Sequence, residues 1–401
     1  MTQKENTVGA RLTDFSQDVS KYREQWSLDS QVAYLNHGSF GAVPKFVAAA
    51  QREIQQLEEN NPNLFFRTTL PKLYDQARTQ VATWLGVPPE LFAFVPNASQ
   101  GVIAATSALI TSPRLQIVAT SLGYGGVLNG LAEIARRTQS TLRIAEIEFT
   151  SGVQNAEDIA DSVFAALTTD TSVVVLDQIT SETALLLPLE QIVRTIRRIA
   201  PQARVVVDGA HTPGMLSPVL PADFDVWVGN FHKWICAPRA SAGLVCKNST
   251  IANQMTPLAP SWGFEKGFPK SFESQGTDDY SSYLVTPDAI KFHDSFNSNE
   301  RDTHNRAIIE EAAKMLHNAW GTEPDVPTEL FCPWMRLVRL PMKKQLTKPE
   351  ADALTLKVSQ ELNTETVIVS PGNSSYVRLS AHIYNEIADY EKLQQIPNLL
   401  S

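Results

Sequence analysis

The sequence predicts an α/β protein: a mostly parallel sheet with helices on both faces forms a large domain, and a smaller α+β domain follows it. Two observations favour this fold class. Between residues 44 and 246, short apolar runs alternate with helical patterns, which is typical of strands buried on both faces of a parallel sheet. After residue 330 a shorter mixed pattern of strands and one helix closes the chain. A length of 401 residues suits two or three domains.

The first part of the pattern begins with two helices. Residues 44–59 start at Pro44 and repeat apolar residues at helical spacing, and residues 71–86 do the same and stop at Gly86. The elements expected next are strands at 91–96, 115–120, 141–147, 172–178, 203–209, 224–230 and 241–246, with helices at 99–110, 127–138 and 189–200.

The texture changes near residues 255–285, which are rich in Pro, Gly, Ser and aromatic residues and read as a long ordered loop. A long helical stretch and a Pro-rich linker follow, at about 287–318 and at 321–330. The small unit is expected to contain strands at 335–341, 366–370 and 376–385 and a helix at 349–363. We therefore expect an N-terminal segment (1–33) that packs with the small domain, a large domain (34–290) and a small C-terminal domain (291–401).

Composition limits the classes of function. The net charge of −9 argues against binding to nucleic acid or to an anionic membrane surface. No stretch is long and apolar enough for a membrane span, and the polar N-terminus does not read as a secretory signal. The three cysteines have no metal-like spacing, so we expect no metal site, no disulfide framework and a cytoplasmic location.

Polar side chains follow several of the expected strands. Asp208 and His211 follow the valines of "VVVDGAHTPG", and His232 and Lys233 follow "VWVGN". Further polar or aromatic groups at strand ends are Asn97, Ser99, Tyr124 and Ser181. Because ligands of parallel sheets bind at the carboxyl ends of the strands, these groups are expected to converge on one edge.

Each of these residues also has an ordinary structural interpretation. Asp208 could be a turn residue, Lys233 a solvated charge, and the two histidines satisfied structural groups. Asn97 and Ser99 could simply cap a helix, and Tyr124 could pack in a loop. Their shared location and one specific chemistry favour function. Pyridoxal phosphate (PLP) needs a lysine for a Schiff base, a carboxylate for its ring nitrogen, a helix N-terminus for its phosphate and an aromatic or imidazole group against its ring.

Nine motifs, in order, carry a resemblance to a known family. They are "YLNHGSFGAVP", "NPNLFFR", "VPNASQGV", "GYGGV", "ITSETALLLP", "VDGAHTPG", "GNFHKW", "GT" at Gly276-Thr277 and "VRLSAHIYN". The chain resembles the fold type I PLP enzymes of the class V aminotransferase group, in the branch similar to isopenicillin N epimerase and cysteine desulfurase. The motifs cover about residues 34–385.

The resemblance implies a role for each matched residue. The catalytic residues would be Lys233, as Schiff-base lysine and proton carrier, Asp208, as partner of the ring nitrogen, and Tyr124, which stacks on the ring. The other cofactor-binding residues would be Ala98, Ser99, Ser181, His211, Asn230, His232 and Thr277. Arg378 would bind the substrate carboxylate as a bidentate fork, and Asn36 and His37 would line the substrate path. Thr277 would reach the phosphate of a neighbouring subunit, which implies a homodimer.

The resemblance implies an enzyme that acts at the α-carbon of an amino acid, as isopenicillin N epimerase does. A C–S β-lyase is the alternative, and an aminotransferase or a non-catalytic PLP-binding protein is a weaker one. Asp177-Gln178 and "SLG" before Tyr124 depart from the family pattern, which leaves the substrate open. Cys332 abuts a predicted strand and lacks the Ser/Gly-rich context of a persulfide-forming loop, which disfavours a persulfide desulfurase.

Two other classes fit less well. A PLP-binding transcription regulator would need a DNA-binding domain, and only about thirty residues precede "YLNHGS". A nicotinamide-binding fold would need the pattern G-x-G-x-x-G after the first strand, and that pattern is not there.

Overall fold

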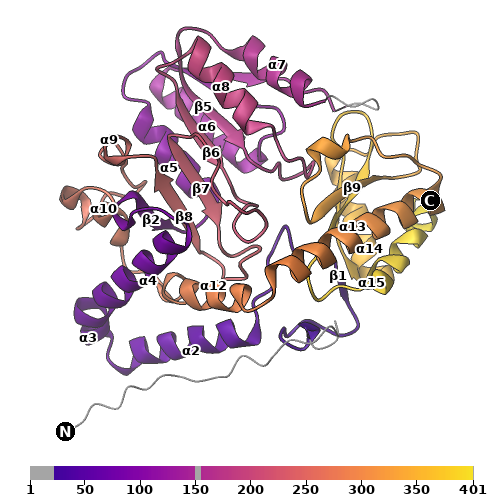
Figure 1. The fold of residues 1–401 in the computed structure, drawn as a ribbon, viewed down its shortest axis with the longest axis horizontal. Coiled ribbons are helices and arrows are strands. Elements are labelled where there is room, and N and C mark those ends of the chain that lie inside the picture. Colours follow the sequence, from indigo (N-terminus) through magenta and orange to yellow (C-terminus); the bar gives the residue numbers. More distant parts are fainter. Residues whose placement is uncertain (1–21, 150–154, 401) are drawn as a thin grey trace.

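A seven-stranded sheet forms the centre of the large domain. The structure is a computed structural model and describes residues 22–149 and 155–400. The sheet order is β2 (Phe92–Val95), β8 (Ala242–Cys246), β7 (Val226–Asn230), β6 (Arg204–Asp208), β5 (Thr171–Asp177), β3 (Gln116–Thr120) and β4 (Thr141–Ala145). The five strands from β7 to β4 run parallel, whereas β8 is antiparallel to both β7 and β2. The predicted fold class, a mostly parallel sheet, is confirmed (Figure 1).

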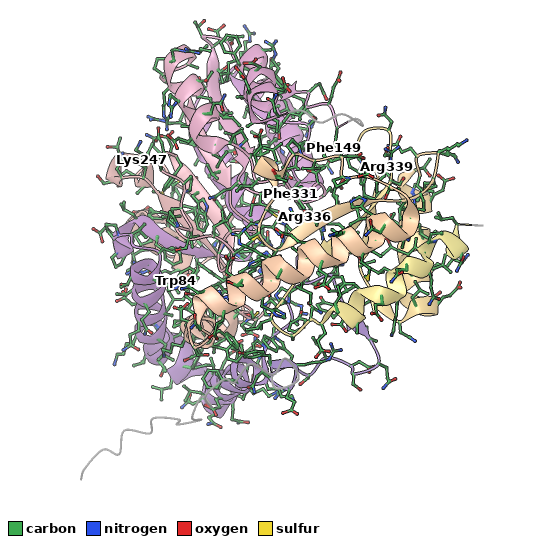
Figure 2. The ribbon with its side chains drawn as sticks, turned by 45° about the vertical axis from the view of Figure 1, so that its right-hand side comes forward. Trp84, Phe149, Lys247, Phe331, Arg336 and Arg339 are labelled. Carbon is green, nitrogen blue, oxygen red and sulfur yellow. The ribbon has the colours of Figure 1, made fainter. Side chains whose placement is uncertain are left out.

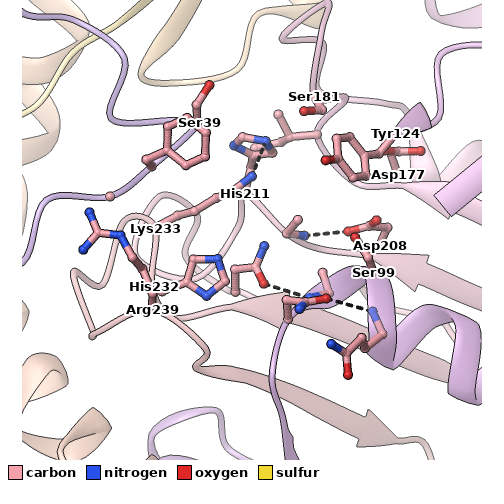
Figure 3. A pocket seen from close by; sticks show the side chains of 18 residues that line it. Ser39, Ser99, Tyr124, Asp177, Ser181, Asp208, His211, His232, Lys233 and Arg239 are labelled. Atoms are coloured by element: carbon pink, nitrogen blue, oxygen red, sulfur yellow. Dashed lines mark hydrogen bonds between the residues drawn. The ribbon is translucent and has the colours of Figure 1, made fainter. Parts of the chain in front are cut away.

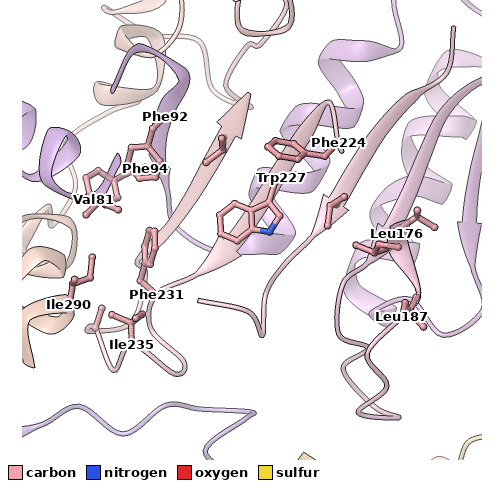
Figure 4. Close-up of a cluster of buried hydrophobic side chains, with 14 of the residues drawn as sticks. Val81, Phe92, Phe94, Leu176, Leu187, Phe224, Trp227, Phe231, Ile235 and Ile290 are labelled. Carbon is pink, nitrogen blue, oxygen red and sulfur yellow. The ribbon is translucent and has the colours of Figure 1, made fainter. Parts of the chain in front are cut away.

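The strands are apolar on both faces because each face packs into its own core. Val205 and Val207 belong to one core, and Val206 between them belongs to the other. The first core also contains Trp227, Phe94 and Phe231 (Figure 4). Fully buried alternating side chains explain why these strands read as continuous apolar runs.

Helices cover both faces of this sheet. The longer helices of the large domain are α2 (Lys45–Asn60), α4 (Leu70–Trp84), α5 (Ala98–Leu109), α6 (Gly125–Thr138), α7 (Ala156–Ala166), α8 (Leu189–Ile199) and α12 (Thr286–Asp294). Helices α5 and α6 pack on the core that contains Val206, and α7 and α8 pack on the core that contains Val207. Short helices are α3 (Pro62–Leu64), α9 (Ser249–Ala252), α10 (Lys270–Glu273) and α11 (Ser281–Leu284).

The small domain is built on a three-stranded antiparallel sheet of order β11 (Val367–Val369), β12 (Tyr376–Ser380) and β9 (Met335–Arg339). Its core includes side chains of α13 (Ser298–Trp320) and α14 (Lys348–Leu362), and α15 (Ile387–Glu391) lies near the C-terminus. The N-terminal strand β1 (Ala33–Tyr34) pairs in parallel with β10 (Thr364–Glu365). Residues about 330 positions apart thus lie side by side, on the right of Figure 1.

Two expectations from the sequence differ from the structure. The helix expected at 287–318 is divided into α12 and α13, because the Asn297 side chain accepts hydrogen bonds from the amides of Asn299 and Glu300 and starts a new helix. The loop expected at 255–285 contains the short helices α10 and α11. The predicted domain boundaries stay predictions, and residues 1–21 lie outside the described part.

Among the described residues, no helix combines the length and apolar character needed to span a lipid bilayer.

Candidate active site

A cavity of about 590 Å³ opens at the carboxyl ends of the parallel strands (Figure 3). Its lining comprises Ser39, Phe40, Gly41, Asn97, Ala98, Ser99, Gln100, Tyr124, Asp177, Ile179, Ser181, Asp208, Ala210, His211, Asn230, His232, Lys233 and Arg239. Nine predicted residues with roles at the cofactor, from Ala98 to Lys233, therefore meet at one edge of the sheet, as the topology requires.

Lys233 follows β7 and is largely buried. Its Nζ lies 2.9 Å from Nε2 of His211. The pKa of Lys233 is lowered to about 7, mainly by burial and also by the nearby charge of Arg378, whereas Asp208 and Asp177 act in the opposite direction. An amine with a pKa near 7 is unprotonated in a large fraction of molecules at neutral pH, so it can serve as nucleophile and base.

His211 stays neutral beside this amine. Burial and the charge of Lys233 hold the pKa of His211 well below its usual range. Its Nδ1 is buried and has no hydrogen-bond partner among the described residues. A buried ring nitrogen without a partner indicates that a polar ligand atom completes the site.

Two carboxyl groups end neighbouring strands. Asp177 of β5 and Asp208 of β6 are paired in the parallel register, so their side chains share one face. Asp208 is 3% exposed and accepts a 2.9 Å hydrogen bond from the amide of Ala210. Burial raises the pKa of both groups, and the charge of Asp208 raises the pKa of Asp177 further. A nearby cation would be stabilised by this pair.

The N-terminus of α5 borders the same cavity, because residues 97–100 belong to its lining. Asn97 caps the helix by accepting a 2.9 Å hydrogen bond from the amide of Gln100. The Asn230 side chain accepts a 2.8 Å hydrogen bond from the amide of Ala98 and so ties the helix to β7. His232 Nδ1 donates to the carbonyl oxygen of Ser241 at 2.9 Å. The positive end of a twelve-residue helix beside Ser99 suits a phosphate group.

Arg378 lies behind the cavity and does not line it. Its guanidinium donates hydrogen bonds to the carbonyl oxygen of Ser181, to Asn36 Oδ1 at 3.1 Å and to Ser39 Oγ at 2.5 Å. Its Nε is buried and lacks a partner within residues 22–149 and 155–400. Asn36 therefore orients Arg378 and does not itself line the cavity. Ser39 does line it and was not predicted, although it lies in the quoted motif "NHGSFG".

His37 differs most from its expected place on the substrate path. It is fully buried behind Lys233, where its Nε2 lies 3.1 Å from the Lys233 carbonyl oxygen and its Nδ1 lies 2.7 Å from the hydroxyl of Tyr384. Gly41 packs against the same backbone: a Cβ there would lie 2.6 Å from the carbonyl oxygen of Lys233. Residues 37–41 therefore pack against the backbone of Lys233 and hold it in position.

The remaining predicted residues lie at the edges. Tyr124 precedes α6, lines the cavity and is 45% exposed. Thr277 is exposed and lies outside the cavity lining. Gln178 has its side chain away from the cavity, where it accepts from the Trp227 indole at 3.2 Å and donates to the carbonyl oxygen of Val219 at 3.2 Å. This departure from the family pattern is thus accommodated in the core.

All three cysteines are free, buried and absent from the cavity lining. Cys332 is 0% exposed and lies 3.5 Å from the carbonyl oxygen of Met335. Burial raises the pKa of each thiol. A buried thiol with a raised pKa is a poor nucleophile.

Residues 42–329 match the family described as aminotransferase class-V. The chain belongs to this family. It is a family of PLP-dependent enzymes, so the predicted resemblance and the enzyme class are confirmed.

The relatives with similar sequences include proteins named as L-cysteine desulfhydrases and proteins named as isopenicillin N epimerases. A probable chloroplastic L-cysteine desulfhydrase of Arabidopsis thaliana is 27% identical over 92% of this chain and 83% of its own. The isopenicillin N epimerase of Amycolatopsis lactamdurans is 25% identical over 94% of this chain and 98% of its own. Among solved structures, a C-DES variant with glycine covalently linked to its PLP cofactor has a TM-score of 0.76 at 20% identity, covering 93% of this chain and 97% of that one.

The residues of the cavity fit PLP. The orphaned His211 Nδ1, the adjacent Lys233 amine, the Asp208 carboxylate and the N-terminus of α5 match the polar atoms of that cofactor. Lys233 would hold its aldehyde carbon, Asp208 its ring nitrogen, and Ser99 with the α5 amides its phosphate. PLP supplies an electron sink for a carbanion at the α-carbon of a bound amino acid.

Proposed function

We propose that this enzyme removes the α-proton of an amino acid and then releases a sulfur-containing group from the β-carbon, as a C–S lyase. The observation that carries the proposal is the Lys233 amine, which has a pKa near 7, lies 2.9 Å from His211 Nε2 and shares the cavity with a pair of carboxyl groups. Membership of the class V aminotransferase family identifies the cofactor as PLP. The names of the desulfhydrase relatives support the choice of the leaving group.

Each wall residue has a distinct task in this reaction. Lys233 takes the α-proton. Asp208 keeps the ring nitrogen protonated, and His211 stays neutral beside the amine, so it does not compete for the proton. Arg378 lies just outside the cavity lining, where Asn36 and Ser39 orient it, and its free Nε makes it the candidate partner of the substrate carboxylate. No thiol lines the cavity, so the sulfur leaves without a protein persulfide.

Epimerisation is the second candidate, and it was the main expectation from the sequence. An epimerase needs two proton carriers, one for each face of the α-carbon. The Tyr124 hydroxyl lines the same cavity as Lys233 and is the candidate for the second carrier (Figure 3). The epimerase relatives support this alternative.

One experiment separates the two reactions. The holoenzyme and its Tyr124→Phe variant are incubated with L-cysteine, L-cystine and a panel of other L-amino acids in deuterated water. A lyase releases pyruvate and sulfide or persulfide, and Tyr124→Phe keeps most of that activity. An epimerase produces the D-isomer with deuterium at the α-carbon and loses that activity in Tyr124→Phe. If no substrate gives either product, both candidate reactions are wrong.

We also propose that the active unit is a homodimer in the cytoplasm. Thr277 is exposed and lies outside the cavity of its own chain, which is what a residue that serves a second subunit requires. Light scattering of the holoenzyme should give the mass of two chains. A mass of one chain at working concentration would contradict the dimer, and fractionation of cells would test the location.

A further inference from the structure

A second cavity, of about 540 Å³, lies in the small domain. It is bordered by the C-terminal half of α13, by residues 321–326 and by the start of β9. It shares no lining residue with the active-site cavity. Its chemistry is therefore independent of the reaction proposed above.

Arg336 of β9 lines this cavity and is only 7% exposed. Its Nη1 is buried without a hydrogen-bond partner, and the side chain forms no hydrogen bond or ion pair with any residue of the described ranges. Its guanidinium carbon lies 3.5 Å from the ring centroid of Phe331, which lines the same cavity (Figure 2).

A buried guanidinium of this kind is costly unless something completes it. Burial removes the charge from water, and the ring of Phe331 satisfies only one face of the cation. The planar fork of donors remains free, and it matches a carboxylate in geometry and charge. Burial lowers the pKa of Arg336 from its usual value, and the charge of Glu310 partly opposes this effect.

The other charged residues of the cavity indicate the net charge of a ligand that would fit it. Lys314 is the second cation of the lining, and Glu310, Glu323 and Asp325 are its carboxylates. Asp325 is already engaged, because it accepts a 2.7 Å hydrogen bond from the Tyr376 hydroxyl. With more acids than bases in the lining, a dianion would be repelled, whereas a molecule with one carboxylate and one ammonium group would be neutral overall.

We propose that this cavity binds an α-amino acid, whose carboxylate pairs with the Arg336 guanidinium and whose ammonium group faces Glu310 and Glu323. The amino-acid side chain would pack against apolar lining residues such as Val326 and Leu337. The ring of Phe331 holds the guanidinium flat, as a carboxylate-binding fork requires.

The test uses the holoenzyme after borohydride reduction, so that an amino acid cannot react in the active site. The melting temperature is measured alone and with each standard L-amino acid at about 10 mM, because a ligand that binds the folded state stabilises it. At least one L-amino acid should raise the melting temperature of the wild type. The same amino acid should leave Arg336→Met unchanged, and calorimetry should show at least a tenfold loss of affinity.

Two variants serve as matched controls. Arg194→Met removes an exposed arginine of α8 that is paired with Glu190, and Arg378→Met removes the arginine proposed for the active site. Both should keep the ligand-induced shift, which separates this site from the active cavity. The carboxylic acid that equals the binding amino acid without its ammonium group should bind more weakly than the amino acid itself.

The unliganded Arg336→Met variant supplies a second readout. Because it removes a buried charge without a partner, it should melt at or above the wild-type temperature. A melting temperature well below that of the wild type would show that Arg336 is structural. The proposal is also wrong if no amino acid shifts the wild type, or if Arg336→Met shows the same shift.

Discussion

The active cavity has two walls of different character. The large-domain wall consists of strand ends that carry Lys233, Asp208 and Asp177, and burial shifts the pKa of all three groups toward their neutral forms. The wall next to the small domain carries Ser39 and Ser181, and Arg378 lies behind them, held in place by hydrogen bonds to both residues and to Asn36. One wall is built to move protons and the other to hold a carboxylate. Changes in the first should therefore lower kcat, and changes in the second should raise KM.

The largest effect is expected from Lys233→Ala. This variant loses the amine that forms the covalent link and carries the proton, so turnover should fall by a factor of roughly 10²–10⁴ or more. Turnover and mass spectrometry of borohydride-reduced peptides measure the two losses. Lys247→Ala, which removes an exposed lysine paired with Asp223, is the control and should keep both properties. A covalent link that survives in Lys233→Ala would show that another amine holds the cofactor.

Asp208→Asn should lower kcat with a smaller effect on KM. Asn can accept a hydrogen bond but carries no charge to keep a ring nitrogen protonated, and loss of one such electrostatic contact typically costs a factor of about 10²–10³. Steady-state kinetics measure the change. Asp177→Asn is the matched control, and its loss should be smaller because Asp208, and not Asp177, is the residue proposed to contact the ring nitrogen. Equal losses of kcat in the two variants would contradict a special role of Asp208 at the ring nitrogen.

Arg378→Met tests the second wall. Breaking a buried, charge-assisted carboxylate contact typically costs about 2–5 kcal/mol, which corresponds to a rise in KM of roughly thirtyfold or more. The cofactor should stay bound, and kcat should change less than KM. Arg306→Met should behave as the wild type. A KM that does not change in Arg378→Met would mean that the substrate carboxylate binds elsewhere.

The smallest effects are shifts in pH dependence. Cofactor-free protein should bind PLP faster as pH rises through about 7, because the Lys233 amine loses its proton there. Asp208 favours the charged amine, so Asp208→Asn should move the midpoint to lower pH. Arg378 disfavours it, so Arg378→Met should move the midpoint to higher pH. Stopped-flow absorbance measures the rate. A wild-type midpoint near 10 would contradict the effect of burial.

Some of this site could be predicted from the sequence because topology determines it. Parallel strands end at one edge of a sheet, so Asp208, His232 and Lys233 had to lie near each other once the strands were recognised. The place of His37 could not be predicted, because it depends on how residues 36–41 pack against the backbone behind Lys233. Gln178 has its side chain in the core although Asp177 next to it lines the cavity, as alternation along a strand requires.

Arg336 shows a different limit. The strand pattern at 335–339 indicates that its side chain lies on one face of β9, but it does not indicate whether an acidic residue of the protein pairs with it there. Only the packing of Phe331 and α13 shows that the guanidinium opens on a cavity. The break between α12 and α13 was missed for a similar reason, since Asn297 can cap a helix or lie within one.

The pairing of β1 with β10 determines the order in which parts of the protein can fold during synthesis. A ribosome makes residues 33–34 about 330 residues before residues 364–365, so the first strand has no partner until that whole stretch has been made. The large domain can assemble as it is translated, whereas the small domain must wait for β10. The segment that follows β1 also lies behind Lys233 and orients Arg378. The catalytic pocket is therefore among the last parts to be completed, and a nascent chain released early would carry the lysine without its support.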